Sequence, residues 1–190
     1  YWNFPFRLSE LGADYYAVSL HKWLYAPIGT GLLYVRKDKI PALWPLFGAA
    51  EPRSGNIRKL EAIGTHPVAN RLAVGEALAF NQAIGIERKA ARLRYLRKQW
   101  TDALRGFERT VLYTSDDPQT SAGLGTVGFK GVDTAALCDY LWKQYRIITT
   151  PIIFDNVNGL RLTPNICTTQ AEMQILIDAL SVIAEKGLPS

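Results

Sequence analysis

The last part of the chain has the clearest pattern of apolar and polar positions. Apolar residues recur there at three- and four-residue steps and form one stripe, which consists of Met173, Leu176, Ile177, Leu180 and Ile183. This period is that of an amphipathic helix. Thr169 and Glu172 precede the stripe at the spacing of a capping box, in which two side chains satisfy the first backbone groups of a helix. The pattern therefore predicts a terminal helix that begins next to Thr169.

Three earlier segments also have helical patterns. The first opens with Pro67 in a helix-start position and runs to about Ala83, just before Gly85. The second covers residues 86–104, and the third extends from Asp133, a good N-cap, to Tyr145. A shorter helix is expected over residues 38–44, where prolines interrupt the chain.

Strands are expected where apolar, β-branched and aromatic residues crowd into short runs. These runs are 14–19, 31–35, the residues around Val111, 125–129, 147–150 and 160–163. The polar, glycine-bearing segment 47–65 is expected to be an irregular loop. Strands and helices mixed in this way predict an α/β protein. We place a boundary near Arg105 and Gly106, so that residues 1–105 belong to a large α/β domain and residues 106–190 form a small α+β domain.

Composition narrows the class of protein. Of the 190 residues 48% are apolar and 21% charged, as in soluble globular proteins. No apolar run approaches the length of a membrane span, and the first residues lack the pattern of a signal peptide. We therefore expect no membrane partner and a cytoplasmic location. Cys138 and Cys167 cannot form a disulfide framework, and with two histidines a dedicated metal site has no support.

The net charge of +5 raises the question of nucleic acid binding. Much of this charge lies in one predicted helix, on Arg88, Lys89, Arg92, Arg94, Arg97 and Lys98. These residues could form a phosphate-binding face or an ordinary solvated helix face. No known nucleic-acid motif accompanies them, so we favour the solvated face and expect no nucleic-acid partner.

Lys22 is the first candidate catalytic residue. A predicted strand ends in the run Ser19-Leu20-His21-Lys22-Trp23, and a Pro/Gly loop then leads into the next strand. A lysine at the mouth of such a loop can be held rigidly and partly desolvated, which frees its amine as a nucleophile. Ser19 and His21 are short hydrogen-bonding groups able to hold an anion beside it. The alternative is an ordinary solvated lysine.

Two further places carry candidate binding residues. Gly64 and Thr65 stand just before the predicted helix at Pro67, where backbone N–H groups and the helix dipole favour an anion. Arg161 lies in a short predicted strand between apolar neighbours. It could be an edge-strand arginine exposed to water, or it could bind a carboxylate, since its planar guanidinium contacts two oxygens at once.

Together these motifs resemble the class V aminotransferase family of fold type I enzymes, which use pyridoxal 5'-phosphate (PLP). The resemblance runs from about Leu8 to about Leu180 and is nearest to the isopenicillin N epimerase-like branch, close to cysteine desulfurases and selenocysteine lyases. The motifs that carry it are Ser19-x-His21-Lys22-Trp23, Gly29-Thr30-Gly31, Gly64-Thr65-His66-Pro67 and Arg161-Leu162-Thr163-Pro164-Asn165. Family members are considerably longer, so the chain matches the second half of the family's polypeptide.

The resemblance implies a role for each candidate residue. Lys22 would form the Schiff base with PLP and later act as general acid and base at the substrate Cα. Ser19 and His21 would bind the cofactor phosphate, and Gly64 with Thr65 would reach the phosphate of the neighbouring subunit, which implies a homodimer with a shared active site. Arg161 would hold the α-carboxylate of a small amino acid substrate.

The resemblance leaves the reaction open among epimerase, aminotransferase and lyase types. A persulfide-forming desulfurase is disfavoured, because residues 146–155 lack the reactive cysteine of those relatives. In the family, the residues that hold the PLP ring precede the position of Tyr1, so this chain alone should bind PLP poorly. A different possibility is a non-catalytic structural or interaction domain that retains the fold of the PLP-dependent transferases.

Overall fold

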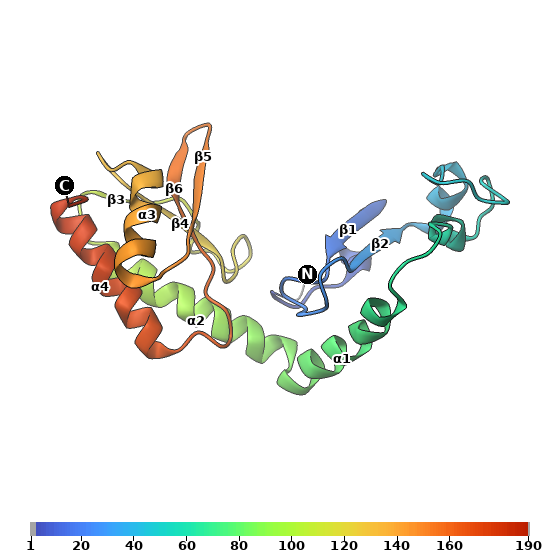
Figure 1. The fold of residues 1–190 in the computed structure, drawn as a ribbon, viewed down its shortest axis with the longest axis horizontal. Coiled ribbons are helices and arrows are strands. Elements are labelled where there is room, and N and C mark those ends of the chain that lie inside the picture. Colours follow the sequence, from blue (N-terminus) through green and yellow to red (C-terminus); the bar gives the residue numbers. More distant parts are fainter. Residues whose placement is uncertain (1–2, 190) are drawn as a thin grey trace. The chain divides into compact units, whose positions relative to one another are not determined.

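The computed structural model describes residues 3–189, whose ribbon is shown in Figure 1. By their internal contacts the residues divide into a first unit that ends at Ile86 and a second unit that begins at Glu87. Nearly all of helix α2 (Ile86–Leu104) thus belongs to the second unit. The division of the whole protein into a domain over 1–105 and a domain over 106–190 stays a prediction.

The first unit is built on a two-stranded antiparallel sheet. Strand β1 (Tyr15–Ser19) pairs with β2 (Gly31–Val35) in a register that sets Ser19 opposite Gly31. Helix α1 (Val68–Ile84) packs against one face of this sheet. The core between them contains Val18, Leu20, Leu24, Ala26, Leu32, Val74, Ala77 and Leu78. Alternation along the strands therefore turns Val18 and Leu32 inward and leaves Ser19 exposed.

Most predictions for the first unit are confirmed. Both strands and helix α1 lie where the pattern indicated, while the short helix expected over 38–44 is a 3-10 helix, η2 (Lys37–Ala42). Two further 3-10 helices, η1 (Leu8–Glu10) and η3 (Ile57–Glu61), were not predicted.

Helix η3 places an unexpected lysine in the interior of the first unit. The buried Lys59 donates to the carbonyl oxygens of Ile40, at 2.6 Å, and Pro52, at 2.9 Å. These hydrogen bonds give order to part of the segment expected to be irregular, and the sequence could not show them because the partners are distant along the chain.

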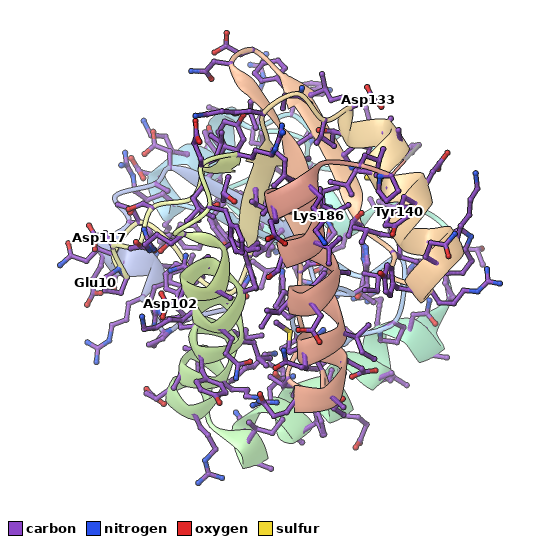
Figure 2. The ribbon with its side chains drawn as sticks, turned by 90° about the vertical axis from the view of Figure 1, so that its left-hand side faces the viewer. Glu10, Asp102, Asp117, Asp133, Tyr140 and Lys186 are labelled. Atoms are coloured by element: carbon purple, nitrogen blue, oxygen red, sulfur yellow. The ribbon has the colours of Figure 1, made fainter. Side chains whose placement is uncertain are left out.

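The second unit contains a four-stranded antiparallel sheet with three helices. Its strands are β3 (Thr110–Leu112), β4 (Gly125–Phe129), β5 (Thr150–Phe154) and β6 (Val157–Leu162), in the spatial order β3-β4-β6-β5. The other two helices are α3 (Thr134–Tyr145) and α4 (Gln170–Lys186). Helices α2 and α4 lie side by side (Figure 2), and the side chains of Gln99 and Gln170 join them through a 2.6 Å hydrogen bond.

The core of the second unit lies between the sheet and its helices. It is formed by the buried residues Leu96, Trp100, Leu104, Val127, Leu137, Leu141, Leu160, Met173, Leu180 and Ile183, among others. Both predicted helix caps are present. Asp133 Oδ1 accepts from the Ala136 N–H at 2.7 Å, and Thr169 and Glu172 form the capping box.

The predicted strand over 147–150 was wrong. Residues 147–149 follow the left-handed Arg146 that ends helix α3, and β5 begins only at Thr150. The strand predicted over 160–163 begins three residues earlier in the structure, where it forms β6 (Val157–Leu162). In the structure Phe154 pairs with Val157, so the turn is Asp155-Asn156.

Gly159 lies inside β6, where the strands approach closely. A Cβ atom added there would lie 2.6 Å from the carbonyl oxygen of Val127 on β4. The glycine is thus required by packing between two strands rather than by a turn. Among the described residues, no helix is both long enough and apolar enough to span a membrane.

Candidate active site

Lys22 lies in a tight turn that backbone hydrogen bonds close at its base. The Leu20 N–H donates to the carbonyl oxygen of Thr30 at 3.0 Å, and the Ala26 N–H donates to that of Leu20 at 3.2 Å. Within this loop the Tyr25 N–H reaches the carbonyl oxygen of Lys22 at 3.4 Å. The loop from Leu20 to Ala26, called the lysine turn below, is therefore fixed directly to the ends of β1 and β2.

Helix α1 holds the lysine turn and the return loop from the side. Asn81 donates its side-chain amide to the carbonyl oxygen of Leu24 at 2.8 Å, and Asn70 donates to that of Ile28 at 3.1 Å. The two asparagines are eleven positions apart, about three helical turns, so they share one face of α1. Sequence reasoning missed them. The signal was available, since Asn81 is a polar residue on the apolar face of a predicted helix.

Tyr25 closes the lysine turn in a strained conformation. Its φ of 63° lies in the left-handed region, which bulky side chains rarely adopt. The ring of Tyr25 contacts that of Phe80 on α1 edge-on, with 5.9 Å between the centroids. Such strain persists only where surrounding contacts impose it, and it is concentrated at functional sites.

The turn presents three polar side chains whose hydrogen-bonding capacity is unused. Within residues 3–189, the side chains of Ser19 and Lys22 form no hydrogen bond or ion pair. Nδ1 of His21 is buried and also lacks a partner among the described residues. A buried ring nitrogen without a partner is costly, and an anion or other polar ligand would satisfy it. A phosphate-bearing cofactor therefore fits these residues.

The sequence left open whether Lys22 is partly desolvated or an ordinary solvated lysine. Within the described residues its side chain is exposed. The described chain supplies a rigid attachment for the amine and leaves its burial to a ligand or to further protein.

Gly64 and Thr65 stand just before helix α1, as predicted. Gly64 has a φ of 75°, and Thr65 is exposed. His66 Nδ1 lies 2.9 Å from the Gly64 carbonyl oxygen, and its Nε2 lies 2.5 Å from Arg71. Because a carbonyl only accepts and a guanidinium only donates, the proton of a neutral His66 is on Nδ1. A cavity of about 620 Å³ adjoins His66, Arg71 and the Gly29–Gly31 loop.

Arg161 lies in the second unit, on the face of the sheet away from the core. Its strand β6 runs between β4 and β5, so Arg161 is not on an edge strand. Thr126 and Thr150 stand directly opposite it on the two neighbouring strands, and Arg161 donates to Thr150 Oγ1 at 3.5 Å. The guanidinium is exposed and flanked by two hydroxyl-bearing residues.

A comparison with protein-family models decides the family. The model described as "Aminotransferase class-V" matches residues 2–150, well over half of the chain. The chain belongs to the class V aminotransferase family. The predicted family is thereby confirmed, and it is a family of PLP-dependent enzymes.

Individual relatives agree with this class V assignment. Over 195 residues the chain is 31% identical to isopenicillin N epimerase of Streptomyces clavuligerus, covering 93% of this chain and 48% of that protein. The apo structure of a cysteine desulfurase from Thermococcus onnurineus NA1 superimposes with a TM-score of 0.80 at 19% identity, covering 98% of this chain and 50% of the other. The chain thus spans about half the length of these class V relatives.

A further solved structure carries a cofactor. It is a C-DES mutant with glycine covalently linked to its PLP cofactor, and it matches with a TM-score of 0.73 at 22% identity over 95% of this chain and 49% of that one. These structural likenesses confirm the predicted fold class, that of the fold type I PLP enzymes, for this part of a class V chain.

Proposed function

We propose that the protein containing this chain is a PLP-dependent enzyme that acts on an amino acid or small amine, with Lys22 as its catalytic residue. The observation that carries the proposal is the lysine turn, in which an exposed amine is held rigidly beside the unpartnered donors of Ser19 and His21. A bound PLP would supply an electron sink for the substrate Cα.

In this proposal the residues around Lys22 each bind a different part of the cofactor or substrate. Ser19 and His21 hold the cofactor phosphate through a hydroxyl and a ring N–H. Gly64 and Thr65 add backbone and hydroxyl donors near the start of α1 and serve the phosphate of a second subunit, so the enzyme is a homodimer. Lys22, fixed to the cofactor site, then takes a proton from the substrate Cα or returns one to it.

Arg161 is proposed to bind the substrate carboxylate. Its guanidinium is exposed, charged and flanked by the hydroxyl-bearing Thr126 and Thr150, so it can donate two parallel hydrogen bonds to a carboxylate. Among the possible reactions, epimerase, aminotransferase and lyase types need no enzyme thiol. Residues 146–155 carry no cysteine, which argues against a desulfurase.

The experiment follows the step that these reactions share, removal of the substrate α-proton. The complete polypeptide with PLP is given a panel of L- and D-amino acids in D2O, and α-proton exchange is followed by NMR. We expect exchange with at least one amino acid, and Arg161→Lys should lower kcat/KM for it at least tenfold without weakening PLP binding. Arg109→Lys, a change at another exposed arginine of the second unit, is the matched control.

Two outcomes would count against the proposal. Bound PLP with no exchange for any amino acid would favour a non-catalytic domain that retains the fold. Equal losses of substrate turnover and cofactor binding in Arg161→Lys would remove the assignment of Arg161 to the carboxylate.

A further inference from the structure

Helix α2 and Arg105, which follows it directly, carry cations on one face that the proposed enzyme site does not use. Arg94, Lys98, Thr101 and Arg105 follow one another at three- and four-residue steps, with Arg97 beside them, so these residues share a face. The sequence predicted an exposed, solvated helix face for the basic residues. That interpretation was wrong for Lys89, which is 1% exposed, and for Arg97, which is 6% exposed.

Arg97 is a buried cation with few partners. It donates one hydrogen bond, from Nη1 to the carbonyl oxygen of Ser115 at 3.3 Å, and its buried Nε has no partner among the described residues. Arg94 has the same pattern, with a 3.1 Å hydrogen bond to the carbonyl oxygen of Pro118 and a buried Nε without a partner. A guanidinium has five N–H donors, so both side chains keep most of their capacity unused.

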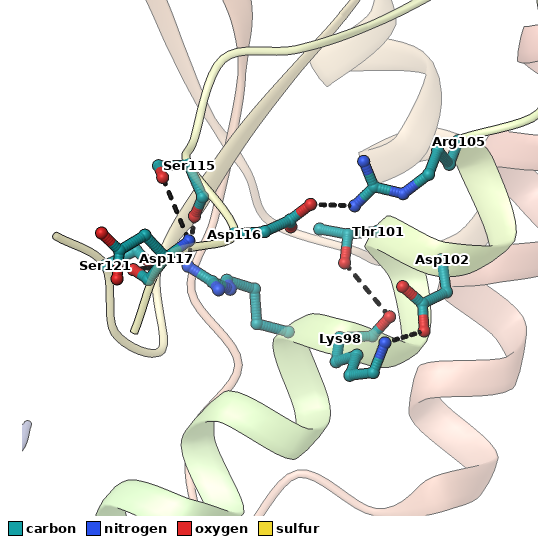
Figure 3. A network of polar contacts seen from close by, with 9 residues as sticks. Lys98, Thr101, Asp102, Arg105, Ser115, Asp116, Asp117 and Ser121 are labelled. Carbon is teal, nitrogen blue, oxygen red and sulfur yellow. Dashed lines mark hydrogen bonds and ion pairs between the residues drawn. The ribbon is translucent and has the colours of Figure 1, made fainter. Parts of the chain in front are cut away.

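The carboxylates near these arginines are already paired with other cations. Asp116 lies 2.5 Å from Arg105, and Asp102 lies 2.5 Å from Lys98; both pairs are visible in Figure 3. Burial lowers the pKa of Arg97 and the neighbouring Arg94 adds to this effect, while Asp116 opposes it. Arg97 is therefore a buried cation whose nearby carboxylate, Asp116, is shared with Arg105.

These groups surround a cavity of about 420 Å³ in the second unit. Its lining includes four cations, Arg94, Arg97, Lys98 and Arg105, and two carboxylates, Asp102 and Asp116. Two positive charges are thus left over at the wall of this cavity, which is partly open to solvent. Buried charges are normally paired, because removing an ion from water is costly. An anion bound in the cavity would pair with these positive charges.

We propose that this cavity binds a small oxyanion of the phosphate or sulfate class between Arg94 and Arg97. Two adjacent guanidinium groups match the tetrahedral oxygens of such an ion through parallel N–H donors. The site lies on α2 and the 115–118 loop of the second unit and shares no residue with the proposed PLP site. Binding would fix this loop on the helix, since the loop carbonyls and the anion are held by the same two arginines.

The test uses the complete polypeptide with PLP bound, so that the cofactor phosphate fills the proposed PLP site, and inorganic phosphate is then added. Thermal unfolding and calorimetry are measured in phosphate and in chloride at equal ionic strength and pH. The proposal expects saturable binding of one phosphate and a melting temperature that rises with phosphate concentration. Arg94→Gln and Arg97→Gln should each weaken binding at least tenfold and abolish the rise in melting temperature.

Arg88→Gln is the matched control, because Arg88 lies on the same helix and is exposed. It removes one positive charge and should bind phosphate as the wild type does. Arg97→Gln also relieves a buried charge, so in phosphate-free buffer this variant should be at least as stable as the wild type. Absence of saturable binding, equal weakening in Arg88→Gln, or equal binding of acetate would each overturn the proposal.

Discussion

Asn81 donates its side-chain amide to the carbonyl oxygen of Leu24 over 2.8 Å and so ties helix α1 to the turn that carries Lys22. The same amide nitrogen also donates to the Ala77 carbonyl oxygen of its own helix at 2.7 Å. Asn81 is completely buried, and water therefore cannot replace these hydrogen bonds. The position of the proposed catalytic lysine thus depends on a hydrogen bond between residues 57 positions apart along the chain.

Replacing Asn81 should loosen the lysine turn. In Asn81→Ala the Leu24 carbonyl loses its partner in the interior, and we expect a loss of about 2 kcal/mol in the local opening free energy. Hydrogen exchange at the Ala26 amide, which closes the turn, measures this loss. Gln82→Ala, at the exposed neighbouring position, should leave the exchange rate unchanged. Equal exchange in wild type and Asn81→Ala would show that the asparagine does not hold the turn.

Lys89 should make stability depend on pH above neutrality. Burial lowers its pKa from the usual 10.5 to about 8. Between these values the unfolded chain binds more protons than the folded chain, so the free energy of unfolding rises with pH across this window. Lys89→Met should therefore be more stable than the wild type at pH 7, and the difference should shrink towards pH 10.

Urea unfolding at pH 7, 8.5 and 10 checks the expectation for Lys89. Lys143→Met, at an exposed position of α3, serves as the control and should show no such convergence with the wild type. A stability difference for Lys89→Met that stays constant over the three pH values would contradict the assigned cause.

The capping box should affect stability in the acidic range. The carboxylate of Glu172 accepts two hydrogen bonds from Thr169, one from its backbone N–H and one from its hydroxyl. These hydrogen bonds lower the pKa of the Glu172 carboxyl below its usual 4.5, the backbone one having the larger effect. Its contribution is fully present above pH 4.5 and is lost as the pH falls through the lowered pKa. Glu172→Gln should be less stable than the wild type at pH 6 and equal to it in strong acid. Glu185→Gln, in the last turn of α4, should not reproduce this change in urea titrations.

Local signals in the sequence were the most reliable. The capping box at Thr169 and the Asp133 cap depend on residues three positions apart, and both are present in the structure. The strand predicted over 160–163 missed the first three residues of β6, where Gly159 packs closely against Val127 of another strand. Contacts between distant segments carry no local signal.

The candidate site likewise combines features that local sequence predicted with features that depend on distant segments. Ser19, His21 and Lys22 are neighbours in sequence, so the motif itself predicted that they would lie together. The anchoring role of Asn81 and the burial of Arg97 depend on what packs against each helix from elsewhere in the chain. Helical periodicity indicates the side of a helix, but it does not reveal the partner on that side.

The most direct measurement of the central claim is covalent trapping of PLP at Lys22. The complete polypeptide is incubated with PLP, reduced with borohydride, digested and analysed by mass spectrometry. We predict one pyridoxyl adduct, on Lys22, which disappears in Lys22→Ala and persists in the control Lys37→Ala, a change at an exposed lysine of the same unit. No adduct, or an adduct that survives in Lys22→Ala, would contradict the account.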